Sequence, residues 1–201
     1  MISIAITSCN RVDLLEKTVK SFFKVNTHPI DRVIIRDDSG MIGVVEKIET
    51  LNLYKCEVIP ENQKIGQLKS IERIYEQIDS EYILHCEDDW EFYKDGFIKK
   101  GIEILKVNDR IIQVWIRPKS DGVGHSPENN LVAVKGDQTG YTWNPHIKRK
   151  KDCIKYSQVG REREIGQYYL DLGYRSAWLT EGYVKHIGKG RHCVVKPKYK
   201  G

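Results

Sequence analysis

The sequence predicts an α/β fold: a single domain with a mixed, mainly parallel sheet flanked by helices. Three observations predict it. Short apolar runs typical of strands alternate with amphipathic helical segments over residues 2–86, their connections are short, and no linker divides the 201 residues. Such alternation favours parallel strands with helices on both faces of the sheet. We expect one domain whose two halves, residues 1–96 and 97–201, have different roles.

The first half is expected to hold four strands and three helices. Each predicted strand is a short run of apolar residues, at 2–5, 33–35, 57–59 and 82–86. Each predicted helix has apolar residues at intervals of three or four, over 11–23, 42–48 and 65–78. Asn10 is expected to cap the first helix, because its side chain can accept a hydrogen bond from a free backbone N–H.

The second half alternates less regularly. Helices are expected over 97–107 and 160–173, the latter ending at Gly173 as a C-terminal cap. Strand-like runs occur at 111–116, 131–134, 140–143, 177–179 and 184–187. Residues 117–130 read as a loop, 146–151 as a basic cluster, and 188–201 as a basic, glycine-rich tail.

Composition narrows the class of protein. With 40% apolar and 30% charged residues, the chain reads as soluble and globular. A net charge of +5 is weak support for an anionic ligand, and it falls short of the dense basic face of a nucleic-acid binder. We therefore expect no nucleic-acid partner.

Cysteine usage and hydropathy indicate the compartment. The cysteines are odd in number, widely spaced and without a C-x-x-C pair, which favours free thiols in a reducing compartment: Cys9, Cys56, Cys86, Cys153 and Cys193. No apolar run approaches the ~20 residues of a membrane span, and the N-terminus lacks the basic start of a signal peptide. We expect a cytoplasmic protein with no transmembrane segment and at most peripheral membrane contact.

Three adjacent acids, Glu87, Asp88 and Asp89, follow the apolar run at 82–84. Adjacent carboxylates at the end of a buried strand repel one another unless a cation lies between them. If the strand continued, Glu87 and Asp89 would share one face and present oxygen ligands suited to Mg²⁺ or Mn²⁺. The alternative is an acidic strand-to-loop junction that faces water.

Polar residues end three of the predicted parallel strands, at 7–11, 36–40 and 87–89. In open sheets of this kind, ligands bind at the carboxyl ends of the strands, so we expect one site along this edge. Ordinary polar turns are the competing interpretation, since Asp-Asp-Ser-Gly is a good turn sequence by itself.

These segments resemble a known family in both order and spacing. Ser3–Arg11 with the helix after it, Ile35–Gly40, Glu61-Asn62 with Gly66, and Glu87–Asp89 are similar to motifs of nucleotide-sugar-dependent glycosyltransferases of the GT-A fold, family 2. The resemblance covers about the first 100 residues. It implies a Rossmann-like sheet and an enzyme that moves a sugar from a nucleoside-diphosphate sugar, by family habit a UDP-sugar, to a hydroxyl of a glycan or glycoconjugate.

The resemblance also implies a donor site. It places the nucleotide against Thr7, Ser8, Asn10 and Arg11, with contacts to its base or ribose from Asp38, Lys69, Glu87 and Asp88. It makes Asp89 a direct ligand of Mn²⁺ or Mg²⁺, with Glu87 and His186 as further ligands, and brings Lys189 and Arg191 to the diphosphate. One departure concerns the metal: the first acid is Glu where the family has Asp, which leaves coordination by Glu87 open.

A catalytic base is implied in the second half. In the family, an acidic pair begins a helix that ends in Gly-Tyr, and here Gly173-Tyr174 ends the helix that starts after Gly160. Counting back from Gly173 makes Glu162 the base and Glu164 the alternative. One base opposite the leaving group implies a single displacement with inversion at the sugar carbon. Alternatively, both are first-turn carboxylates favoured by the helix dipole.

The acceptor is expected to contact residues 117–160, where Trp115, Trp143 and His146 are the candidates in and beside that range. Aromatic faces suit the apolar side of a pyranose, although such rings also form cores. Two other functions compete: a nucleotidyltransferase acting on a sugar phosphate, and a non-catalytic carbohydrate-binding module. The loop at 7–11 contains no glycine, which argues against the phosphate loop of a nucleotidyltransferase.

Overall fold

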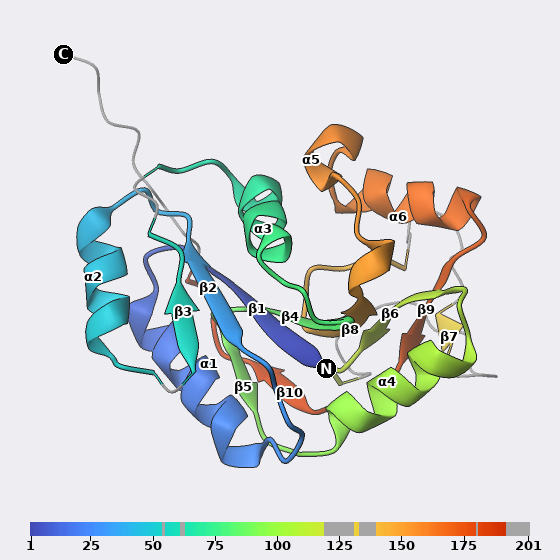
Figure 1. Ribbon diagram of the computed structural model, residues 1–201, viewed down its shortest axis with the longest axis horizontal. Helices are drawn as coiled ribbons and strands as arrows, with labels where there is room; N and C mark the ends of the chain where they lie inside the picture. The colour runs from blue at the N-terminus through green and yellow to red at the C-terminus, as the bar shows by residue number, and fades with distance from the viewer. Residues whose placement is uncertain (54, 61–62, 119–130, 133–139, 180, 192–201) are drawn as a thin grey trace.

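An eight-stranded mixed sheet runs through the protein in the order β3-β2-β1-β4-β8-β6-β9-β7 (Figure 1). The computed structural model describes residues 1–53, 55–60, 63–118, 131–132, 140–179 and 181–191. The strand pairs β3–β2, β2–β1, β1–β4 and β6–β9 are parallel, whereas β8 and β7 run antiparallel to their neighbours. The predicted α/β class with a mixed, mainly parallel sheet is confirmed.

The first half follows the predicted alternation. Its elements are β1 (Ile2–Ser8), α1 (Val12–Val25), β2 (Val33–Asp37), α2 (Ile42–Thr50), β3 (Cys56–Val58), α3 (Gln67–Glu76) and β4 (Tyr82–Glu87). The predicted cap is wrong, because α1 begins after Arg11 and no side chain caps it. Asn10 instead adopts a positive φ of 52° and donates its backbone N–H to Asp37 Oδ2 at 2.7 Å.

The second half departs further from expectation. Its elements are β5 (Trp90–Phe92), α4 (Phe97–Val107), β6 (Ile111–Trp115), β7 (Leu131–Val132), β8 (His146–Arg149), the 3₁₀ turn η2 (Lys150–Asp152), α5 (Tyr156–Val159), α6 (Glu162–Asp171), β9 (Arg175–Trp178) and β10 (Val184–His186). Residues 140–143 do not form the predicted strand. The unpredicted β5 pairs antiparallel with β10 in a second, two-stranded sheet.

The predicted basic cluster at 146–151 contains a strand, β8, that the sequence did not predict. This strand lies buried between β4 and β6, and both of its basic side chains are paired. Lys148 Nζ donates to the hydroxyls of Tyr141 (3.2 Å) and Tyr156 (2.5 Å). Arg149 donates to backbone carbonyls around the end of α4 and the start of β6 and pairs with Asp152. Long basic side chains are buried here because their polar ends find partners.

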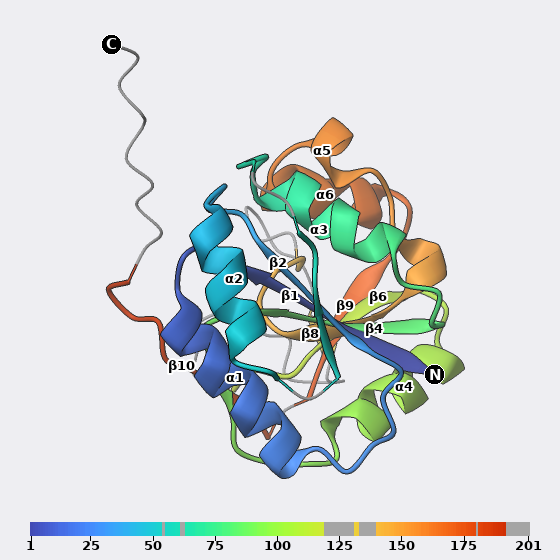
Figure 2. The ribbon, with the colours of Figure 1, turned by 60° about the vertical axis from the view of Figure 1, so that its left-hand side comes forward.

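Helices cover both faces of the large sheet (Figures 1 and 2). Helices α1, α2 and α4 pack on one face around a core that includes Leu15, Ile48 and Phe97. Helices α3, α5 and α6 cover the other face around a second core that includes Ile71 and Tyr156. Because β1, β2 and β4 are parallel neighbours, their carboxyl ends meet at one edge, as predicted.

The thiols are partly as expected. Cys56, Cys86 and Cys153 are free. Cys9 is disulfide-bonded, so the prediction of free thiols is wrong for this residue, and Cys193 lies outside the described residues. Spacing along a sequence does not reveal which cysteines meet in space. Within the described part of the chain, no helix is long and apolar enough to cross a membrane.

Candidate active site

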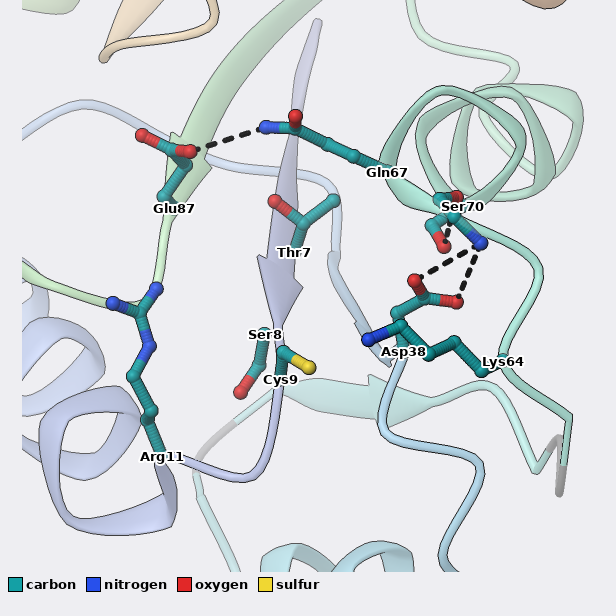
Figure 3. A pocket seen from close by; sticks show the side chains of 10 residues that line it. Thr7, Ser8, Cys9, Arg11, Asp38, Lys64, Gln67, Ser70 and Glu87 are labelled. Carbon is teal, nitrogen blue, oxygen red and sulfur yellow. Dashed lines mark hydrogen bonds between the residues drawn. The ribbon is translucent and has the colours of Figure 1, made fainter. Parts of the chain in front are cut away.

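A pocket of about 270 Å³ opens where β1, β2 and β4 end (Figure 3). The ends of the strands and Arg11, the residue before α1, form one side of the pocket. Helix α3 and the segment before it form the other side. Its lining residues are Thr7, Ser8, Cys9, Arg11, Asp38, Lys64, Gly66, Gln67, Ser70 and Glu87. The structure therefore brings together five residues predicted for the donor site: Thr7, Ser8, Arg11, Asp38 and Glu87.

Asp38 anchors the chain that leads into α3. One carboxylate oxygen, Oδ1, accepts the backbone N–H of Ile65 at 2.8 Å and Arg36 Nη1 at 2.9 Å. The other oxygen, Oδ2, accepts the N–H of Gly66 at 3.0 Å. Gly66 precedes α3 with φ +89°, a left-handed conformation that L-residues rarely adopt. The side chain of Asp38 thus shapes the pocket wall as well as lining it.

Arg11 lies between two of the three adjacent acids. Its guanidinium forms a two-point ion pair with Asp88, in which Nε donates to Oδ2 at 3.1 Å. Its Nη1 donates to Asp89 Oδ2 at 2.7 Å. Asp88 is fully buried and also accepts Ser8 Oγ at 2.8 Å. Burial raises the pKa of Asp88 to about 6, and the positive charge of Arg11 opposes that rise.

The acids do not share faces as a continued strand would require. Strand β4 ends at Glu87, and the chain turns at Asp88 and Asp89 before β5 begins. Glu87 alone faces the pocket, where its Oε1 accepts Gln67 Nε2 at 3.2 Å (Figure 3). Burial, followed by the charges of Asp89 and Asp88, raises the pKa of Glu87 to about 8. Its carboxyl group is therefore largely protonated at neutral pH.

Asp89 and His186 form a pair suited to a divalent ion. Asp89 Oδ2 lies 3.3 Å from His186 Nε2, whose ring packs against Trp90. Asp89 Oδ1 is buried without a hydrogen-bond partner among the described residues. A buried carboxylate oxygen without a donor, beside an imidazole nitrogen, fits Mn²⁺ or Mg²⁺. No group of three or more His, Cys, Asp or Glu in the described residues is arranged to hold a metal.

Of the two candidate bases, Glu162 is the one whose charge acts on the acidic run. Its Oε1 accepts the backbone N–H of Trp143 at 2.8 Å. Its negative charge is among the causes that raise the pKa of Glu87, so the two carboxyls lie near one another. Glu164 instead packs beside Gly160, where an added Cβ would lie 3.3 Å from Glu164 Cβ.

Several predicted donor residues lie away from the pocket. Asn10 and Lys69 are exposed and do not line it. Lys189 is exposed on the segment after β10. Arg191 pairs with Asp13 at 2.6 and 2.9 Å, and its carbonyl accepts Arg11 Nη1 at 3.0 Å. Contacts of these residues with a donor stay predictions.

The candidate acceptor residues are buried. Trp115 and Trp143 are 1% and 4% exposed, and His146 is fully buried. Trp115 packs on Trp178 with ring centroids 5.5 Å apart, and His146 stacks on His85 at 5.2 Å. All three belong to the interior in this structure, so an acceptor-binding role for them stays a prediction.

Sequence reasoning missed Cys9, Lys64, Gln67 and Ser70 in the pocket. A signal existed for two of them. Gln67 and Ser70 are three residues apart just after Gly66, so once α3 is placed they fall on one helix face. Lys64 follows no regular element and carried no such signal.

Comparison with known proteins agrees with this fold. The sequence model of the family described as "Glycosyl transferase family 2" matches residues 3–170. No curated protein sequence matches. Among solved structures, Staphylococcus aureus TarS 1–349 in complex with UDP-GlcNAc superposes with a TM-score of 0.63 at 16% identity, over 95% of this chain and 61% of that one.

Two further structures share the fold. The mannosyltransferase PcManGT from Pyrobaculum calidifontis, in complex with GDP-Man and Mn²⁺, gives a TM-score of 0.66 at 12% identity, over 94% of this chain and 57% of that one. CMP:2-keto-3-deoxy-manno-octonic acid synthetase with CTP gives 0.61 at 8% identity, over 91% and 90%. The chain thus spans about three-fifths of the two glycosyltransferase structures. At these identities the likeness concerns the fold alone.

Proposed function

The chain belongs to glycosyl transferase family 2, and we propose that it transfers a sugar from a nucleoside-diphosphate sugar to a hydroxyl of a glycan or glycoconjugate. One observation carries the proposal. The pocket at the ends of β1, β2 and β4 is bordered by the Arg11–Asp88–Asp89 cluster, and its residue Glu87 feels the charge of Glu162. Binding groups for a nucleotide, a candidate metal ligand and a candidate base therefore converge on one edge of the sheet.

The proposed donor is a UDP-sugar. Support comes from the pocket, whose size suits part of a nucleotide, and from TarS, which was solved with UDP-GlcNAc. PcManGT was solved with GDP-Man, so a guanine nucleotide is the donor to test beside it.

Asp89 and His186 are the residues that would hold Mn²⁺ or Mg²⁺. When bound, such an ion neutralises the charge that develops on the leaving diphosphate. The buried oxygen of Asp89 and the neighbouring imidazole support this assignment. Glu87 is the weaker candidate, because its Oε1 already accepts a hydrogen bond from Gln67, whereas Asp89 Oδ1 is buried without a partner among the described residues.

Glu162 is the proposed general base. A carboxylate within hydrogen-bond reach of the acceptor hydroxyl takes its proton as the oxygen attacks the sugar carbon. The Trp143 N–H fixes the orientation of this carboxylate through Oε1, which leaves Oε2 for the acceptor. A single displacement of this kind inverts the configuration at the sugar carbon. Arg11, which lines the pocket, contributes positive charge near the diphosphate.

The test is an assay of what the enzyme releases. Purified protein is incubated with UDP- and GDP-sugars, Mn²⁺ and a panel of glycan acceptors, and nucleoside diphosphate and pyrophosphate are both measured. We expect UDP release that depends on acceptor and metal. Pyrophosphate release from a nucleoside triphosphate and a sugar phosphate would instead establish nucleotidyl transfer, whose enzymes share this fold. Glycan binding without release of either product would establish a carbohydrate-binding module.

A further inference from the structure

Arg36 is a fully buried cation near the carboxyl end of β2, where it follows three apolar residues. It lies in β2 on the same face as Ile34, which belongs to the core beneath α3. Burying a guanidinium is costly unless its donors are paired. Arg36 does not line the pocket, yet its partners Asp38, Ser70 and Gln63 border or precede the pocket wall formed by α3.

Three separate segments meet at this guanidinium. Nη1 donates to Asp38 Oδ1 at 2.9 Å and to Ser70 Oγ at 2.5 Å, and Nη2 donates to the carbonyl of Gln63 at 3.1 Å. These partners lie at the end of β2, in the first turns of α3, and in the segment between β3 and α3. Arg36 therefore connects the end of β2, the segment before α3 and the start of α3, which together form one wall of the pocket.

The partners of Arg36 extend the network to the pocket surface. Asp38 accepts the backbone N–H groups of Ile65 and Gly66 at 2.8 and 3.0 Å. Ser70 Oγ donates to the Gly66 carbonyl at 2.9 Å. Half of the ten lining residues lie in these connected segments: Asp38, Lys64, Gly66, Gln67 and Ser70. The wall reaches the acidic run through Gln67, whose Nε2 donates to Glu87 Oε1 at 3.2 Å.

We infer that Arg36 is a positioning residue for the donor: it touches no substrate but holds the α3 wall in the conformation that binds the nucleotide end of the nucleoside-diphosphate sugar. This inference rests on the proposed function. Among the described residues, the hydrogen bonds of the network do not run through the proposed base Glu162 or the proposed ligand Asp89, so we expect it to contribute to donor binding equally in the ground and transition states. Loss of such binding raises the donor KM and leaves kcat unchanged.

The experiment compares Arg36→Met with the wild type. The dissociation constant of UDP is measured by titration calorimetry, and the KM values for donor and acceptor and kcat by steady-state kinetics. We expect the UDP dissociation constant and the donor KM to rise roughly tenfold to a hundredfold, as for displaced positioning groups. The kcat at saturating donor and the acceptor KM stay near wild-type values. Arg36→Lys, which keeps the charge, recovers part of the affinity.

The matched control is Arg32→Met. Arg32 precedes the same strand and also loses an ion pair, with Glu57 at 2.8 Å, but it contacts no residue of the pocket wall. We expect its UDP affinity to match that of the wild type.

Loss of Arg36 alone leaves the buried Asp38 carboxylate without its cation, so the single variant could fail to fold. The double variant Arg36→Met/Asp38→Asn removes both charges, and its comparison with Asp38→Asn, which lacks the same pocket carboxylate, isolates the part due to Arg36. The inference would be overturned by a folded Arg36→Met variant that binds UDP as tightly as the wild type, or by a double variant that binds UDP as tightly as Asp38→Asn. An equal fall in kcat with a changed acceptor KM would overturn it as well. A wild-type protein that binds no nucleoside diphosphate would overturn the proposed function, and this inference with it.

Discussion

Three adjacent acids acquire three different environments in this protein. Asp88 is buried against Arg11 and Ser8. Asp89 contacts both Arg11 and His186. Glu87 accepts a hydrogen bond from the side-chain amide of Gln67. Their mutual repulsion is relieved by one guanidinium and by protonation of Glu87 rather than by exposure to water. A turn after Glu87 is what separates them.

The raised pKa of Glu87 predicts a pH dependence of stability. Its pKa rises from 4.5 to about 8 on folding, so the folded state holds a proton that the unfolded state releases between those values. The contribution of Glu87 to the free energy of unfolding is therefore greatest below pH 4.5 and is lost as the pH rises toward 8. Glu87→Gln stays neutral and keeps an acceptor for Gln67. Melting temperatures in chelator across pH 5–8 should fall more steeply for the wild type than for Glu87→Gln, and parallel curves would contradict this prediction.

Substitution by Gln should have different effects on kcat at Glu162 and at Glu164. Glu162→Gln should lower kcat by roughly 10²- to 10⁴-fold, the usual contribution of a general base, with a small effect on donor KM. Glu164→Gln, two residues on, is the matched control and should change kcat by less than about threefold. Steady-state transfer rates measure both. Loss of activity in Glu164→Gln alone would identify the other carboxylate as the base.

At the level of elements, the segment after β10 packs against the turn formed by Asp88 and Asp89. Ile187 donates its N–H to the Asp89 carbonyl at 2.8 Å, and Arg11 holds the Arg191 carbonyl. Gly188 lies so close that an added Cβ would be 2.6 Å from Asp89 Cβ and would collide with its carboxylate. The absence of a side chain at Gly188 is what allows this contact.

Gly188→Ala should therefore displace the Asp89 carboxylate. We expect a fall of roughly tenfold to a hundredfold in Mn²⁺ affinity or activity, the usual effect of disturbing a ligand's support. Gly43→Ala in α2 is the control, since a Cβ there meets nothing within 4 Å. Calorimetric titration with Mn²⁺ and a transfer assay measure the effect, and unchanged metal binding in Gly188→Ala would exclude Asp89 as a ligand.

Helix α4 packs on β8 through Gly101, where an added Cβ would lie 2.6 Å from Ile147 Cδ1. Gly101→Ala should cost about 1–3 kcal/mol by overpacking, partly offset by about 1 kcal/mol of helix propensity. Ile147→Val removes the colliding carbon, so Gly101→Ala/Ile147→Val should unfold at a higher denaturant concentration than Gly101→Ala. The reverse order would show that the contact is not tight.

The elements of the first half could be predicted because their apolar periodicity is strong and agrees with their burial. Strand β8 could not be predicted, because its His, Lys and Arg residues form a basic cluster whose burial depends on tertiary partners that the sequence does not show. Strand β5 was hidden for a related reason: three residues after an acidic turn become a strand only by pairing with β10, almost a hundred residues later.

At the scale of the whole molecule, one sheet holds both parts of the site. The parallel strands β1, β2 and β4 form the donor side of the site. Strands β8 and β6 follow in the same sheet and connect this side to α5 and α6, and α6 begins with Glu162. The position of the pocket could be predicted from the strand order alone. The α3 wall with Lys64, Gln67 and Ser70, and the buried Arg36 behind it, could not, because those contacts join segments that the sequence keeps about 30 residues apart.

The central claim is that this sheet edge binds a nucleoside diphosphate with the help of a metal at Asp89. Thermal unfolding of the wild type and Asp89→Asn with UDP, each with and without Mn²⁺, tests it most directly. A ligand at 100 times its dissociation constant stabilises the folded state by about 2.7 kcal/mol, which raises the melting temperature of a domain this size by about 5–10 °C. We predict a shift of this size for the wild type with UDP and Mn²⁺, a smaller one without Mn²⁺, and no metal-dependent part in Asp89→Asn. No shift with either UDP or GDP, or the same Mn²⁺-dependent shift in Asp89→Asn, would contradict the account.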